Sequence, residues 1–190
     1  MPNPLDRLIA LAVADIERAT LVLNGGGSVA TWRKEMERII TTQTTAAYIT
    51  ATAQRLGIPA DSALISRARL SRAERADIAR QVQDQLRFLN GFQAALGTLS
   101  PAQVLARARL YATGPRAFYS AMRWAEWEIP DRLLPGRQTC MGNCRCELTG
   151  VSDNGDGTGV LTRVMRGSEN HCTECPPLAG DHVVRRRRAA

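Results

Sequence analysis

The sequence predicts a mainly α-helical protein, a helical bundle followed by a small cysteine-rich zinc module with a β-hairpin. Apolar residues recur at three- and four-residue steps through about two thirds of the 190 residues, as on the buried stripe of a helix. All five cysteines lie in two short runs nearer the other end, an arrangement that suits a tetrahedral metal site. Between these runs, short apolar and polar stretches alternate around Asn154–Gly157, which is a hairpin turn signal.

Several long helices are expected in the first part of the chain, each with its own start or stop signal. Glycine-rich breaks end the first two, capping boxes begin the next two, and Gly114-Pro115 splits the last. The predicted segments are 6–23, 29–56, a helix from Ser71 to Gly97, a helix from Ser100 to Gly114, and 116–128.

These elements divide the chain into four parts. We expect a helical domain over 1–128, a proline-bounded linker over 129–137, a zinc-binding β-hairpin module over 138–182 and a basic tail over 183–190. The glycine run 24–28 lacks the Gly-Lys-Ser/Thr ending of a phosphate loop and predicts a flexible hinge, through which the first helix swings onto a partner.

The cysteines are the main candidate site. Two close-spaced groups separated by a hairpin-sized insert predict one structural Zn²⁺, bound by the second group and two thiols of the first. Disulfides are an alternative that leaves one thiol over, and a redox pair is another, although two prolines follow the last cysteine where a redox motif normally opens a helix. The candidate ligands are Cys140, Cys144, Cys146, Cys172 and Cys175, and which four bind metal stays open.

The two histidines do not suggest catalysis. His171 is adjacent to Cys172, which makes simultaneous metal binding by both awkward, so we expect it to lie beside the ligands or to be exposed; the other histidine is His182. With no Ser-His-Asp pattern, no paired-carboxylate motif and a closed set of thiols, the sequence predicts that the chain is not an enzyme.

The net charge of +7 permits contact with nucleic acid or another acidic surface, and Lys34 is the only lysine. Coding bias toward arginine explains the charge equally well. Arg185, Arg186, Arg187 and Arg188 are weak candidates for phosphate or partner contact. No signal peptide and no apolar run long enough to span a bilayer is visible, so we expect synthesis in the cytosol and no membrane partner.

Two cysteine elements resemble those of the phage head morphogenesis family, also called Mu F-like proteins. Asn143-Cys144-Arg145-Cys146 resembles the NCRC element of that family, and Cys172-x-x-Cys175-x-x-Leu178-x-Gly180 resembles its other element. The helical stretches QLRFLNGF and SPAQVLARARLYATGPRAFYSAMR are similar more loosely. Two departures stand out: the order of the elements is reversed, and Cys140 stands near the place where the family has a histidine before NCRC.

The resemblance implies a structural virion protein of a tailed bacteriophage, a minor head or portal-proximal component that acts in head assembly. It implies assembly in the host cytoplasm, several copies per particle and contact with the portal or major capsid protein. The arginine tail would contact packaged double-stranded DNA or an acidic protein surface. The alternative function is a zinc-containing DNA-binding protein, although no helix carries a concentrated basic stripe.

A partner surface is expected on the helices. Phe118, Trp124 and Trp127 cannot all face one way on a single helix, and the stretch 41–52 is rich in threonine. In the alternative interpretation, the zinc module folds back over these rings.

Overall fold

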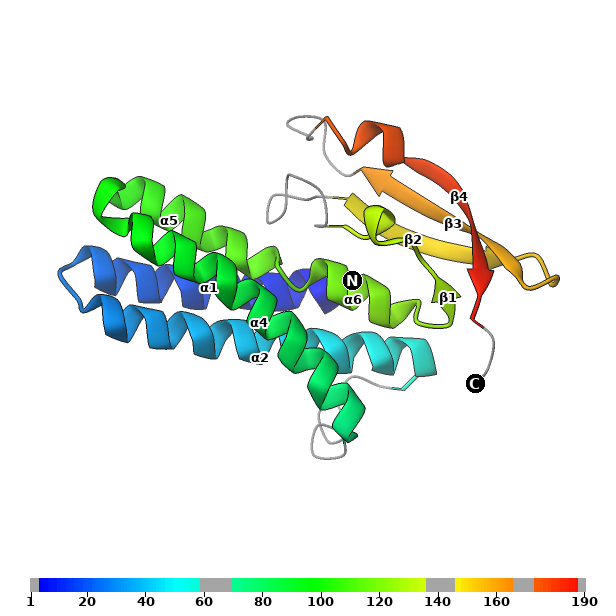
Figure 1. Ribbon diagram of the computed structural model, residues 1–190, viewed down its shortest axis with the longest axis horizontal. Helices are drawn as coiled ribbons and strands as arrows, with labels where there is room; N and C mark the ends of the chain where they lie inside the picture. The colour runs from blue at the N-terminus through cyan, green and yellow to red at the C-terminus, as the bar shows by residue number, and fades with distance from the viewer. Residues whose placement is uncertain (1–3, 59–69, 136–145, 166–172, 188–190) are drawn as a thin grey trace.

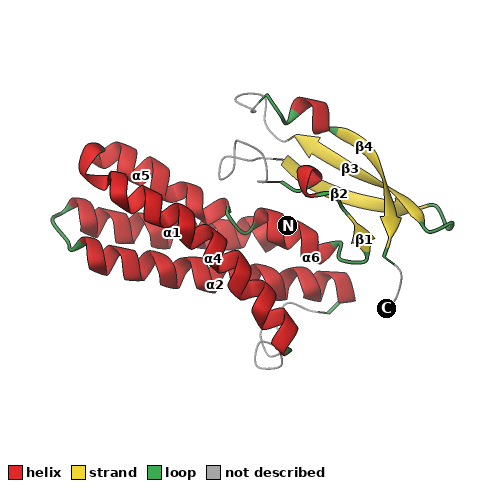
Figure 2. Cartoon of the chain, viewed as in Figure 1, coloured by secondary structure: helices red, strands yellow, loops and turns green. Residues whose placement is uncertain are grey.

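The computed structural model describes residues 4–58, 70–135, 146–165 and 173–187 of the chain. It is mostly helical with one small antiparallel sheet, which confirms the predicted class at that level (Figures 1 and 2). The α-helices are α1 (Pro4–Asn24), α2 (Val29–Leu56), α4 (Arg72–Ala95), α5 (Pro101–Arg109) and α6 (Arg116–Arg123). Short 3-10 helices are η2 (Leu96–Thr98), η3 (Leu110–Thr113), η4 (Asp131–Leu133) and η6 (Pro176–Leu178). The strands are β1 (Trp127–Glu128), β2 (Cys146–Asp153), β3 (Thr158–Met165) and β4 (Gly180–Arg186).

The helices α1, α2, α4 and α5 form an elongated bundle with its own apolar interior (Figure 1). Ile16, Met36, Ile39 and Leu89 are at most 2% exposed and belong to one cluster. The predicted capping boxes are confirmed at the starts of α4 and α5, where each N-cap serine exchanges hydrogen bonds with the third helical residue.

The glycine run between α1 and α2 forms a tight, hydrogen-bonded turn. The amide of Gly25 donates to the carbonyl of Leu21 (3.0 Å), and that of Gly27 donates to Val22 (2.9 Å). A Cβ on Gly27 would lie 2.6 Å from the Val22 carbonyl oxygen, so only glycine fits. Ile16 of α1 is also buried in the core. The glycine run, which we expected to be a flexible hinge, therefore joins two packed helices.

The sheet has the strand order β1-β4-β3-β2, and every neighbouring pair is antiparallel. The predicted hairpin is confirmed as β2 and β3. Its turn uses its carboxylates internally: Asp153 accepts from the amide of Gly155 (2.9 Å), and Asp156 accepts from the amide of Thr158 (2.8 Å). Because both carboxylates accept hydrogen bonds from backbone amides, this segment is the predicted hairpin turn. Strands β1 and β4 were not predicted.

The helix α6 joins the bundle to the sheet, which lies over it at one end of the molecule (Figure 2). Three consecutive residues of α6 pack in different apolar clusters. Ala117 packs in the sheet cluster, Phe118 packs in the bundle cluster, and Tyr119 packs in a third cluster with Leu5 of α1. One helix of eight residues therefore contributes to both regions.

Most residues of the expected partner surface are buried, so the prediction of an exposed surface is wrong for them. Phe118 and Trp127 are 7% and 3% exposed, and Trp124 is half-buried. Trp127 lies in strand β1 and packs against sheet residues such as Leu161. In the threonine-rich stretch, Thr44 is fully buried and accepts a hydrogen bond from Gln85 Nε2 (3.2 Å). The alternative, in which the C-terminal part covers the rings, describes Trp127, whereas Phe118 packs inside the helical bundle.

Two predicted boundaries also shift. Within the expected linker, Leu133 and Leu134 are buried in the sheet cluster. The expected tail begins inside β4, which continues to Arg186, and the Arg187 amide donates to the Glu126 carbonyl (2.8 Å). The hydrogen bonds of the sheet, rather than the charge of the arginine run, decide where this segment lies.

Candidate functional site

One cysteine from each predicted element comes to the same buried place. Cys146 is the first residue of β2, and Cys175 directly precedes η6. Each is 1% exposed, and both pack in one cluster with Met165, the residue that faces Cys146 across the β2–β3 ladder. The hairpin thus brings its two ends, Cys146 and Met165, to the place where Cys175 is buried.

A buried arginine lies beside this pair. Arg163 of β3 is 1% exposed and faces inward with Leu161. Its Nη1 donates to the carbonyl oxygen of Arg132 (3.3 Å), and its Nη2 lies 3.8 Å from Sγ of Cys175. A charge held away from water requires strong acceptors, and an ionised sulfur is one of them.

The chemistry of these donors fits a soft metal ion such as Zn²⁺. Cysteine sulfur is a preferred zinc ligand, and an adjacent guanidinium favours an electron-rich sulfur centre. Within the described ranges, no group of three or more cysteine, histidine or carboxylate side chains gathers to hold a metal. Cys140, Cys144, Cys172 and His171 lie outside those ranges. The structure therefore brings together two of the five predicted ligands, and zinc itself stays a prediction.

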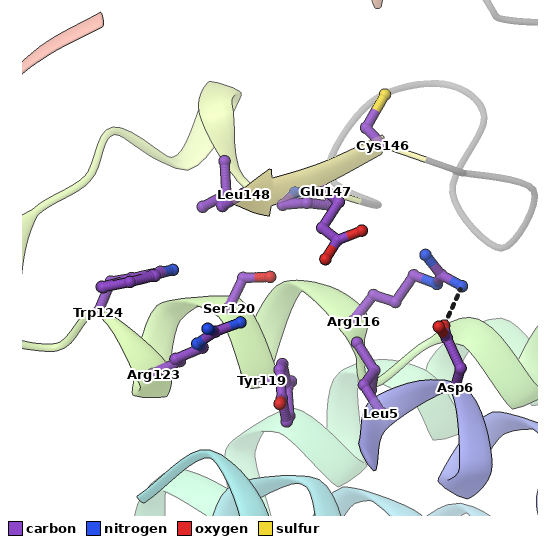
Figure 3. Close-up of a pocket in the computed structure, with 11 residues that line it drawn as sticks. Leu5, Asp6, Arg116, Tyr119, Ser120, Arg123, Trp124, Cys146, Glu147 and Leu148 are labelled. Carbon is purple, nitrogen blue, oxygen red and sulfur yellow. Dashed lines mark ion pairs between the residues drawn. The ribbon is translucent and has the colours of Figure 1, made fainter. Parts of the chain in front are cut away.

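Next to this cluster, α1, α6 and β2 form a charged corner (Figure 3). Glu147 points toward α6, whereas Cys146 points away from it, and Arg116 pairs with Asp6 at 3.6 Å. The cavity here has a volume of about 10 Å³. That is about the room one water molecule needs.

The arginine run is largely engaged within the sheet. The Arg186 guanidinium lies 5.4 Å from the centre of the Trp127 ring and 3.3 Å from an Asp153 carboxylate oxygen. The Arg187 Nε donates to the carbonyl of Trp127 (3.3 Å). Arg185 is exposed, and Arg188 lies outside the described residues. These contacts join the end of the chain's last strand to Trp127 of β1 and to Asp153 of β2, so two of the predicted phosphate contacts have structural partners.

The clearest pKa shifts lie in the helical bundle. Burial raises the pKa of Tyr111 to about 12 and, together with the Glu74 carboxylate, raises that of Tyr48 well above its usual value. Hydrogen bonds from Ser71 lower the pKa of Glu74. These groups belong to the core and to a helix cap, so they do not mark a catalytic centre.

Arg163 is the site residue that the sequence analysis missed. Its signal was the two-residue period of β3, in which the sequence Gly159-x-Leu161-x-Arg163 puts a charge on the same face as two buried positions. A charged residue in the inward register of a strand indicates either a misplaced strand or a buried polar partner.

No protein-family model matches this chain, and no similar curated protein or solved structure was found. Among the helices of the described residues, none has the length and apolar character needed to cross a membrane.

Proposed function

We propose that this chain is a structural protein of a tailed-phage particle, a minor head or portal-proximal component with a structural zinc centre. The observation that carries the proposal is the meeting of Cys146 and Cys175, which come from the two elements that resemble the head morphogenesis family. One cysteine of each element therefore supports the proposal by packing in the same buried cluster.

The role we propose is architectural. Zinc would tie the ends of the hairpin and the start of η6, because a small sheet gains little stability from its own core. Cys175 and two of Cys140, Cys144 and Cys146 would bind it together with Cys172. The helical bundle would supply the surface that contacts the portal or major capsid protein.

Elemental analysis tests the metal. Protein purified without added zinc should carry about one equivalent per chain, and Cys175→Ser should lose it. Mass spectrometry of the alkylated chain serves as the control for oxidation. Metal-free protein with its cysteines paired as disulfides would contradict the zinc centre.

Particle composition tests the virion role. Purified heads of the phage that encodes this chain should contain it in a fixed copy number, measured by quantitative mass spectrometry, and the free chain should co-sediment with heads or portal rings. If the chain is absent from particles and binds duplex DNA with a steep salt dependence, it is instead a DNA-binding zinc protein.

A further inference from the structure

One end of the helical bundle is formed by residues without charge, although 23% of the chain is charged. The connection from α1 to α2 and that from α4 to α5 lie together at the end farthest from the sheet (Figure 1), where Asn24 Nδ2 donates to the carbonyl of Pro101 (3.2 Å). Residues 19–32 and 88–106, which contain these two connections, include no Asp, Glu, Lys or Arg. We call these two stretches the bundle tip.

The bundle tip exposes aliphatic side chains. Leu21 and Val22 of α1 are each 60% exposed, and Val29 of α2 is 41% exposed. Another uncharged stretch, 39–54 of α2, is mostly buried, so packing accounts for its lack of charge. Packing does not account for the tip. An exposed apolar surface without charges is typical of a site that leaves water when a partner binds.

Polar groups of the bundle tip are hydrogen-bonded to one another. The amides of the glycine run donate to carbonyls in the last turn of α1. At the other connection, Ser100 and Gln103 form the capping box of α5, and Thr98 Oγ1 donates to the carbonyl of Ala95 (2.8 Å). Removing a polar group from water costs free energy chiefly when that group lacks a hydrogen bond. Because these groups already have partners, the tip can leave water at a low cost.

Basic side chains border the bundle tip. Arg18 and Arg33 flank the first uncharged stretch, and Arg87 and Arg107 flank the second. We call these four arginines the basic collar. The side chains of Arg18 and Arg87 are 76% and 80% exposed, and each pairs with an aspartate three residues earlier, which lies farther from the tip. The last residue of α1, Asn24, is six residues beyond Arg18, so the tip extends about 9 Å past the collar at about 1.5 Å per residue.

We propose that the bundle tip inserts into the surface of a membrane that contains anionic lipids. The order of groups along the bundle matches that of a bilayer, because a tip inserted about 5–10 Å deep puts its aliphatic side chains at the acyl boundary and the collar at the phosphates. A second copy bound tip to tip would bring two basic collars together, so the collar favours an anionic partner.

This contact goes beyond the structural role proposed above and does not depend on it. It also differs from our expectation of no membrane partner, which considered only segments that span a bilayer. Insertion of a helix connection into the surface of a bilayer does not require such a segment.

Matched leucine variants test the insertion. Leu21→Gln and Leu11→Gln make the same change at exposed positions of α1, but Leu11 precedes the collar and lies farther from the tip. Binding of the full chain to vesicles of phosphatidylglycerol and phosphatidylcholine in equal amounts is measured by flotation. Leu21→Gln should weaken binding by about fivefold to tenfold, because an exposed apolar side chain no longer leaves water, and Leu11→Gln should change it by less than about twofold. Equal losses in the two variants, or no loss in Leu21→Gln, would contradict the insertion.

Matched arginine variants test the basic collar. Arg87→Gln and Arg80→Gln each remove an exposed guanidinium of α4 that pairs with an aspartate three residues earlier, but Arg80 lies farther from the tip. Arg87→Gln should weaken binding to the anionic vesicles by about fivefold, whereas Arg80→Gln should bind as the unsubstituted chain does. Binding that survives Leu21→Gln and Arg87→Gln but is lost in Arg185→Gln would assign the lipid contact to β4 and overturn the proposal.

Sedimentation velocity identifies the other possible occupant of the tip. A chain that binds no anionic vesicles and forms a dimer that Leu21→Gln dissociates would show that a second copy covers the tip. A monomer that binds no anionic vesicles would also overturn the proposal. Neither result changes the proposed virion role, which particle composition decides separately.

Discussion

Leu89 of α4 and Leu161 of β3 are both fully buried, but their surroundings differ in kind. Leu89 lies in a large cluster of side chains from several helices. Leu161 lies in a smaller one, two residues from a buried guanidinium and near two buried thiols. The bundle is closed mainly by apolar packing, with neutral buried hydrogen bonds such as that from Gln85 to Thr44, whereas one corner of the sheet region contains a buried charge and two thiols. The comparison indicates that a buried charged group distinguishes the sheet region from the bundle.

The largest loss of stability should come from removing a fully buried side chain from the core of the bundle or of the sheet region. Leu89→Ala and Leu161→Ala should each lower the free energy of unfolding by about 2–5 kcal/mol, because each removes a fully buried side chain. Since α6 contributes to both interiors, we expect one cooperative transition in urea for both variants.

Coincident curves by far-UV circular dichroism and tryptophan fluorescence would check this. Curves that separate in Leu161→Ala alone would show that the sheet region unfolds independently of the bundle.

A glycine-to-alanine substitution should lower the stability in the sheet region and raise it in the bundle. A Cβ on Gly159 of β3 would lie 2.7 Å from Val151 Cγ1 and 2.8 Å from the Trp127 ring, so Gly159→Ala should cost about 1–3 kcal/mol. A Cβ on Gly91 of α4 meets nothing within 4 Å, and Gly91→Ala should add about 0.5–1 kcal/mol through helix propensity. Thermal unfolding of the pair measures both, and a stabilising Gly159→Ala would contradict the close packing of β1 on β3.

The smallest effect concerns the cap of α4. Hydrogen bonds from the Ser71 backbone and hydroxyl, and from Tyr48, lower the pKa of Glu74 below its ordinary 4.5. A lowered pKa means that the carboxylate stabilises the fold above about pH 4.5, and this stabilisation is lost as the pH falls through the pKa of the folded state. Glu74→Gln should therefore cost about 0.3–1 kcal/mol at neutral pH and nothing in strong acid.

Denaturant titrations of both proteins across this pH range test the expectation. A difference between them that is independent of pH would assign the effect to side-chain shape rather than to charge. Glu126→Gln, which removes the same negative charge at an exposed position, controls for the change in net charge.

Local signals explain what the sequence could predict. The capping serines and the glycine breaks lie within a few residues of the helices they bound, and both helix starts agree with the structure. The hairpin β2–β3 was predicted because its turn signal lies between its own strands. Strand β4 was missed because its run of charged residues pairs with distant partners, Trp127 among them. The inward position of Arg163 fits the two-residue period of β3, but the partners that bury it come from η4 and from Cys175, which lie apart from β3 in the sequence.

The pairing of β4 with β1 affects the order in which the chain can fold during synthesis. Arg187 and Trp127 are 60 positions apart, so the partner of β1 leaves the ribosome well after β1 itself. The α1–α2 hairpin joins neighbouring segments and can form as soon as both have emerged. On a growing chain the helices therefore find their partners early, while Trp127 remains uncovered until β4 arrives. A chaperone that protects newly made apolar surface would meet this protein at Trp127 rather than in the bundle.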